Sequence, residues 1–202
     1  MKKLLSFALC AIMMFSIFAV TASAAETYTV VKGDSMWKIA VKYEVGLSEI
    51  KAANPHIKNP DLIYPGQTLN IPTTDATALR FEKEVVRLVN EIRKQNGISE
   101  LTYDWQLSRV ARIKSEDMRD NKYFSHTSPT YGTPFQMIKS FGITYRSAGE
   151  NIARGQTTPQ RVVNAWMNSS GHRANILNKA FTHIGVGYVK DGNYWTQMFI
   201  SK

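Results

Sequence analysis

Residues 183–200 read HIGVGYVKDGNYWTQMFI, two apolar stretches on either side of a polar turn. The stretches are rich in β-branched and aromatic side chains, which favour strands. The intervening Asp191-Gly192-Asn193 is typical of a tight turn, because glycine and asparagine adopt the required backbone angles at little cost. The pattern therefore predicts a β-hairpin over 183–200.

Helical patterns precede this hairpin. Apolar residues recur every three or four positions from residue 79 to Asn96-Gly97, and again after a predicted cap at Asp104. Two more helices are predicted to begin at Thr133-Pro134 and Thr158-Pro159, since threonine caps a helix and proline suits its first turn. Helices followed by a terminal antiparallel sheet predict an α+β domain over 79–202.

A smaller unit lies upstream. Alternating apolar and polar residues at 28–30 and 69–71 predict two short strands that pair. Two helical patterns lie between them, the first capped by Asp34 or Ser35, the second capped by Ser48 and ended by Asn54-Pro55. We expect Trp37 on the buried face of the first helix. The predicted order is strand, helix, helix, strand, with a linker at 73–78.

The N-terminal residues 1–25 have the layout of a secretory signal peptide. Lys2 and Lys3 precede an apolar run, which ends in small residues around Ala22 and Ala24. The alternative is an uncleaved membrane anchor, but polar residues follow directly where an anchor would carry a basic cluster. We therefore expect export and no stable membrane span after cleavage. Cys10, the single cysteine, lies in this segment, so thiolate chemistry is not expected in the mature protein.

The net charge of the sequence indicates which kinds of partner to expect. The sequence has 25 basic and 16 acidic residues, and loss of Lys2 and Lys3 leaves 23 against 16, a net charge of +7. Such a surface favours polyanions, which outside a cell include wall phosphate polymers. A basic balance that merely keeps the protein soluble is an equally good interpretation. No nucleic-acid reading motif is present, so nucleic acid is not an expected partner.

The small unit carries a specific pattern, YTVVKGDSMWKIA at 28–40, NP at 54–55 and LIYPGQTLNIP at 62–72. It resembles the LysM module. The resemblance implies a βααβ fold over 26–72 that binds N-acetylglucosamine glycans, either peptidoglycan or chitin. By position, the implied groove is formed by Gly33, Asp34, Ser35 and Met36 on one side and by Pro60, Asp61, Leu62, Ile63 and Tyr64 on the other. Met36 and Ile63 would form an apolar floor for the acetamido methyl group.

Four motifs mark the larger domain: FSHTSP at 124–129, GENIA at 149–153, WMNSSGHRANIL at 166–177 and GVGY at 185–188. They resemble the CAP superfamily, also called SCP-like. The resemblance implies an α-β-α sandwich with a cleft lined by two histidines and two acids, sometimes with a bound metal. His126, Glu150 and His172 match three of those four positions. The second acid, expected just after Trp166, has no match.

Two imidazoles and a carboxylate suit two kinds of chemistry. His126 and His172, with Glu150, could hold a divalent ion such as zinc beside an open site for water. The same three residues could act as acid and base with no cofactor. Ser125 adjoins His126 but is not expected to be a nucleophile, and His56 and His183 have no motif partner.

Two functions remain open. In the first, a secreted wall or spore-envelope protein binds peptidoglycan through its LysM module and presents a non-catalytic CAP cleft to a ligand, an ion or an envelope or spore-coat protein. In the second, the CAP domain is a hydrolase of wall peptide or polymer, delivered by LysM. Attachment raises the local concentration in both cases and does not distinguish them. The missing acid favours the first.

Overall fold

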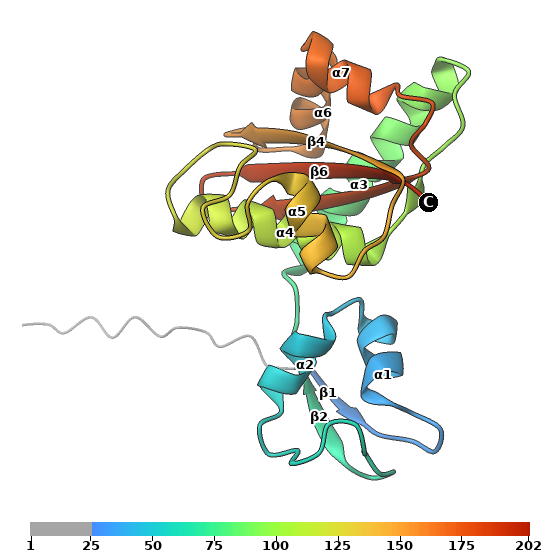
Figure 1. Ribbon diagram of the computed structural model, residues 1–202, viewed down its shortest axis with the longest axis vertical. Helices are drawn as coiled ribbons and strands as arrows, with labels where there is room; N and C mark the ends of the chain where they lie inside the picture. The colour runs from blue at the N-terminus through green and yellow to red at the C-terminus, as the bar shows by residue number, and fades with distance from the viewer. Residues whose placement is uncertain (1–25) are drawn as a thin grey trace, which may run out of the picture.

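The computed structural model describes residues 26–202, and the predicted signal peptide at 1–25 lies outside them. The chain forms an N-terminal module and a larger C-terminal domain, joined by one extended connection (Figure 1). Among residues 26–202, no helix is both long and apolar enough to cross a bilayer.

The N-terminal module has the predicted order of elements. Strand β1 (Glu26–Thr29) is followed by helices α1 (Met36–Tyr43) and α2 (Leu47–Ala53) and by strand β2 (Thr68–Ile71). The strands pair antiparallel, with Tyr28 opposite Leu69. Asn54 is buried and ties the end of α2 to β2, since its side chain exchanges hydrogen bonds with the backbone N–H and carbonyl of Asn70, both at 2.7 Å. This contact stabilises a core too small to depend on hydrophobic burial alone.

Two local predictions for this module were wrong. Trp37 is 48% exposed. The buried face of α1 carries Met36, Ile39 and Ala40, which recur at helical spacing, and Trp37 lies on the other side. Ser35 caps α1 as expected, but α2 begins after Gly46 without a side-chain cap, and Ser48 lies inside the helix.

The C-terminal domain contains five helices and four strands. In chain order they are α3 (Ala76–Gln95), β3 (Thr102–Tyr103), α4 (Trp105–Asp120), α5 (Pro134–Ser140), β4 (Ser147–Arg154), α6 (Pro159–Met167), α7 (Ser170–Ile176), β5 (His183–Val189) and β6 (Tyr194–Ser201). The predicted caps at Asp104, Thr133 and Thr158 are all present. Helix α3 begins at Ala76 after the cap Asp75, so the predicted linker 73–78 is shorter than expected.

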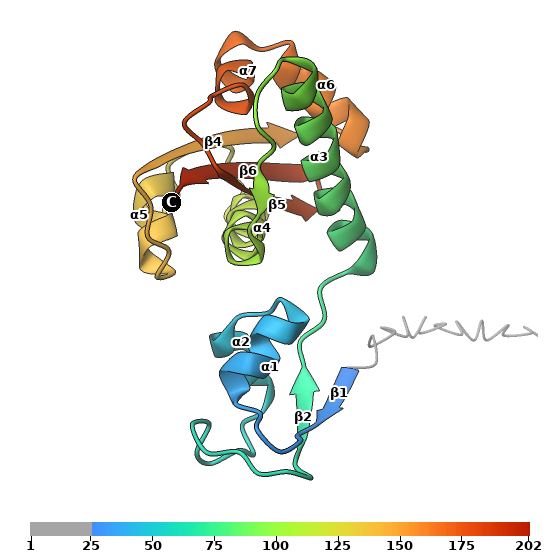
Figure 2. The same ribbon diagram turned by 90° about the vertical axis from the view of Figure 1, so that its right-hand side faces the viewer.

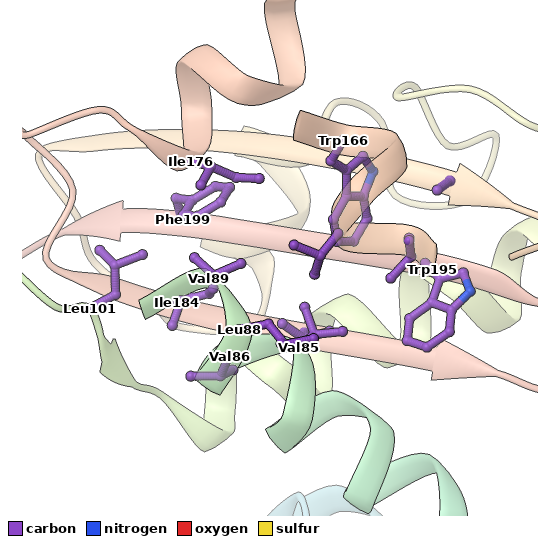
Figure 3. Packing of buried hydrophobic residues seen from close by; sticks show 14 of the residues in the cluster. Val85, Val86, Leu88, Val89, Leu101, Trp166, Ile176, Ile184, Trp195 and Phe199 are labelled. Atoms are coloured by element: carbon purple, nitrogen blue, oxygen red, sulfur yellow. The ribbon is translucent and has the colours of Figure 1, made fainter. Parts of the chain in front are cut away.

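The sheet forms the middle layer. Its strand order is β3-β5-β6-β4, with β6 antiparallel to both neighbours and β3 parallel to β5. Helices α3, α6 and α7 cover one face, and α4 and α5 cover the other (Figure 2). The first face is filled by Val85, Val89, Trp166, Ile184 and Phe199 (Figure 3). The expected α-β-α sandwich is confirmed.

The hairpin strand β5 contacts α4 closely. Gly185 and Gly187 are two positions apart and face α4, where a Cβ atom on Gly187 would lie 2.0 Å from the backbone nitrogen of Arg112. Because β3 is short, Val186 and Tyr188 on the open edge of β5 donate their backbone N–H groups to Ser108 and Glu82. Helix side chains thus accept the hydrogen bonds of backbone N–H groups at the edge of the sheet.

Candidate functional site

His126 and Glu150 are brought together. His126 lies in the loop between α4 and α5, and Glu150 lies on β4. The imidazole Nδ1 is 2.7 Å from Oε1 of Glu150, although the residues are 24 positions apart. The side chain of His126 is 53% exposed and that of Glu150 only 2%. The pair thus joins a solvent-facing imidazole to a buried carboxyl group.

A hydrogen-bond network fixes the loop that carries His126. Asp117 on α4 is buried and accepts hydrogen bonds from the hydroxyl groups of Ser128 (2.7 Å), Thr130 (2.6 Å) and Tyr123. Lys114, also buried on α4, donates to the hydroxyl of Tyr123 (2.9 Å) and to the backbone carbonyl of His126 (3.0 Å). The backbone of His126 is therefore held in place from the helix below it.

His172 reaches the same region from the short helix α7. Two asparagines hold α7 against β4: Asn151 donates to the backbone carbonyl of His172 (3.1 Å), and Asn175 donates to the side chain of Asn151 (2.8 Å) and the carbonyl of Glu150 (3.2 Å). Burial, and after it the charge of a protonated His126, lowers the pKa of His172. Helix α7, which carries His172, is thus held beside the strand that carries Glu150.

Burial determines the electrostatics of Glu150. It raises the pKa of this carboxyl group, an effect that the hydrogen bond from His126 and the charge of Lys114 oppose. Oε2 of Glu150 is buried and makes no hydrogen bond with any of the residues 26–202. A buried carboxyl oxygen without a partner disfavours the ionised form, so Glu150 takes up a proton more readily than an exposed carboxyl group does.

A divalent ion at His126 and His172 stays a prediction. Among the residues described, no three His, Cys, Asp or Glu side chains converge as the ligands of a metal ion would. One oxygen of Glu150 is already bonded to His126. Met167, Asn168 and Ser169 stand where the second acid is expected, and Asn168 ends α6. In this arrangement His126, Glu150 and His172 do not present a ready set of ligands to a divalent ion.

The two histidines are expected to titrate on opposite sides of their ordinary pKa of 6.5. The hydrogen bond to Glu150 raises the pKa of His126, whereas burial and then the charge of His126 lower the pKa of His172. NMR titration of the ring protons measures both, and Glu150→Gln should lower the midpoint of His126. Coincident midpoints in the wild-type protein would contradict this arrangement.

The residues of the predicted groove lie in two loops of the N-terminal module, and the first loop carries Gly33, Asp34 and Ser35. Gly33 is exposed with φ +93°, which only glycine adopts readily, and its carbonyl accepts a hydrogen bond from Lys38. The carboxylate of Asp34 closes this turn by accepting from the hydroxyl of Tyr28 and the backbone N–H of Val31. Ser35 is used as the helix cap. These groups shape the first loop.

The second loop presents apolar side chains. Leu62 is 51% and Tyr64 55% exposed, and Ile63 between them packs on the core. Pro60 is half-buried, and Asp61 lies 3.5 Å from the ammonium group of Lys51. Met36 is 3% exposed, so it belongs to the core and the expectation of Met36 as an accessible groove floor was wrong.

Sequence reasoning missed the residues that position the site. Asn151 and Asn175 lie inside the quoted motifs, but their pattern gave no hint that they bond to each other. Lys114 did leave a signal. It follows Leu107, Val110 and Ala111 at helical spacing, and a lysine on the apolar face of a helix needs a buried partner.

Comparison with known proteins shows which families the two parts of the chain resemble. Residues 86–200, more than half of the chain, match the model of the cysteine-rich secretory protein family, or CAP. The chain belongs to the CAP family. Residues 28–72 match the LysM domain, so the protein has a LysM module followed by a CAP domain.

Two relatives come from Bacillus subtilis. The CAP domain is similar to the uncharacterized protein YkwD of Bacillus subtilis, 62% identical over 60% of this chain and 48% of that protein. The uncharacterized membrane protein YlbC of the same organism is 35% identical over 80% of this chain and 49% of its own length. The chain thus spans about half the length of these relatives. A crystal structure of an extracellular SCP-domain protein from Bacillus anthracis matches with a TM-score of 0.61 and 35% identity, over 68% of this chain and 47% of that one.

Proposed function

We propose that this protein is exported, binds N-acetylglucosamine glycans of the cell wall or spore envelope through its LysM module, and presents its CAP domain there. The observation that carries the proposal is the pair of exposed apolar side chains, Leu62 and Tyr64, in one loop of a LysM fold whose other loop has an exposed turn at Gly33. Large apolar side chains left in water next to one another are typical of a binding surface. Similarity to a protein described as extracellular supports export.

The chemistry of the loops suits an acetamido sugar. Such a sugar offers an N–H donor, a carbonyl acceptor and a methyl group. Exposed backbone at Gly33 can exchange hydrogen bonds with the amide, and Leu62 and Tyr64 can cover the methyl group and the ring. The proposed partner is therefore peptidoglycan or a chitin-like glycan.

Truncation of the exposed loop tests the proposal. Tyr64→Ala should raise the Kd for a β-1,4-linked N-acetylglucosamine oligomer by at least about tenfold, since burial of an aromatic side chain contributes roughly 1.5–3 kcal/mol. Calorimetry measures the Kd, and co-sedimentation with purified sacculi measures attachment. Val41→Ala is the matched control, because Val41 is 40% exposed on α1 outside the predicted groove. Equal affinities of the Tyr64 variant and wild type would contradict the proposal that this loop binds the glycan.

A second function, hydrolysis of wall peptide or polymer, is proposed for the CAP domain because Glu150 is buried, protonatable and bonded to His126. In this role Glu150 would donate or accept a proton, and the imidazoles would accept a proton or orient the substrate. Release of muropeptides or peptides from sacculi that stops in His126→Ala and His172→Ala, but not in a His183→Ala control, would favour the enzyme. Sedimentation without release would favour a CAP domain that binds a ligand or an envelope protein.

A further inference from the structure

A cleft of about 370 Å³ lies between the LysM module and the CAP domain. Its walls come from α1 and the start of α2 on one side, and from α4 and the segment after α5 on the other. Figure 2 shows α4 facing the module across this junction. The volume falls within the range of roughly 300–1,000 Å³ that ligand sites occupy. The cleft contains neither His126 nor Tyr64, so it is separate from both sites described above.

Two indole rings line the cleft. Trp37 comes from α1 and Trp105 from the first turn of α4, and their ring centroids are 6.3 Å apart at 41°. Trp37 stays 48% exposed in spite of this contact. Trp166 and Trp195, by contrast, are 1% and 0% exposed in the CAP core. An indole that remains half in water at a domain junction is typical of a binding surface.

The junction is built around Arg109. Its guanidinium bonds to Glu49 at 2.7 Å and to the hydroxyl of Ser48 at 3.2 Å, and it lies over the ring of Phe141. A Cβ atom on Gly46 would lie 2.4 Å from that guanidinium, so glycine makes room for the ion pair. Lys83 and Tyr103 add contacts from the CAP domain to Glu44. These contacts set the spacing of the two walls.

The same contacts determine which ligand fits. Arg109 is paired with Glu49, so the cleft offers its occupant no uncompensated charge at this position and does not favour a phosphate polymer. The remaining lining side chains carry no charge. They are the two indoles, the neutral polar side chains of Ser48, Gln106 and Ser140, and the apolar side chains of Leu47, Val110, Phe141 and Ile143. A sugar ring has an apolar C–H face and a rim of hydroxyl and amide groups, which match an aromatic face and neutral hydrogen-bonding groups.

We propose that this cleft is a second sugar-binding site, which takes a neutral amino-sugar chain with its rings against Trp37 and Trp105. The class of ligand in this proposal rests on the proposed function of the LysM module. The location of the site rests on Trp37 and Trp105, which that function does not use. Trp37 directly follows the predicted groove segment 33–36 along the chain. Two sites on one protein raise the overall affinity for a polymer, which a single LysM module would bind weakly.

Acrylamide quenching of tryptophan fluorescence tests the site in the chain from residue 26 to the C-terminus. Because Trp166 and Trp195 are buried, quenchable emission comes from Trp37 and Trp105. A β-1,4-linked N-acetylglucosamine hexamer should at least halve the quenching constant at saturation. Trp37→Ala should weaken binding about tenfold, as expected when a central tryptophan is lost. Phe135→Ala is the matched control, since Phe135 is also 48% exposed and does not line the cleft.

The outcomes separate the two proposals. If calorimetry detects binding of the hexamer but the tryptophans are not protected from quenching, the proposal that the cleft binds sugar is overturned. The LysM groove then remains the proposed binding site. Protection that persists in Tyr64→Ala, while Trp37→Ala weakens binding, supports the cleft even if the groove fails. If the hexamer protects the tryptophans but Trp37→Ala binds it as tightly as wild type, the rings report only on the contact between the domains. This result would also overturn the proposal that the cleft binds sugar. Protection of the tryptophans by inorganic polyphosphate but not by the hexamer would overturn the proposal that the ligand is neutral.

Discussion

Glu82→Ala is expected to lower the free energy of unfolding by about 3–5 kcal/mol, the range for breaking a buried ion pair by removing one partner. The side chain of Glu82 is 0% exposed and accepts two hydrogen bonds from Arg112 (2.9 and 2.6 Å) and one from the backbone N–H of Tyr188 (3.0 Å). The substitution leaves a largely buried guanidinium without its carboxylate and an edge N–H of β5 without an acceptor. Urea unfolding followed by circular dichroism measures the change.

A surface ion pair provides the control. Arg87 bonds to Glu84 and Glu91 on the exposed side of α3, and water screens these charges. Arg87→Ala should leave the urea midpoint nearly unchanged. Equal midpoint shifts for the Glu82 and Arg87 variants would mean that burial is not the source of the effect.

Gly187→Ala is expected to cost about 3 kcal/mol, the upper part of the usual range for overpacking. The added Cβ atom would lie 2.0 Å from the backbone nitrogen of Arg112 and 2.2 Å from the carbonyl carbon of Ala111. Backbone atoms of a helix cannot rotate away as a side chain can, so β5 and α4 would have to separate. Thermal unfolding of the full chain measures the loss.

Gly171→Ala is the matched control for this substitution. Gly171 lies in α7, where no heavy atom comes within 4 Å of an added Cβ. Alanine is favoured over glycine inside a helix by about 1 kcal/mol, so the variant should be as stable as wild type or slightly more so. A loss in Gly171→Ala as large as in Gly187→Ala would show that contact with α4 is not the cause.

The local signals in the sequence predicted most of the fold. The hairpin over 183–200, the helices that begin after Asp104, Thr133 and Thr158, and the βααβ order all follow from short-range spacing and capping. Strand β4 and helix α7 were not predicted. Residues 147–154 lack an alternating pattern because β4 lies next to β6 and is covered along much of its length, and α7 is short and has no side-chain cap.

The sequence by itself determined which chemical groups are available: a carboxyl group and two imidazoles in CAP motifs, a glycine turn in a LysM motif, and no cysteine beyond residue 10. Only the tertiary structure decided which of them meet. The pairing of His126 with Glu150, the burial of Lys114 and the contact of Trp37 with Trp105 join residues that lie far apart in the chain or on different elements. Periodicity reports the face on which a side chain lies. Its partner depends on how the layers and domains pack, and no local spacing encodes that packing.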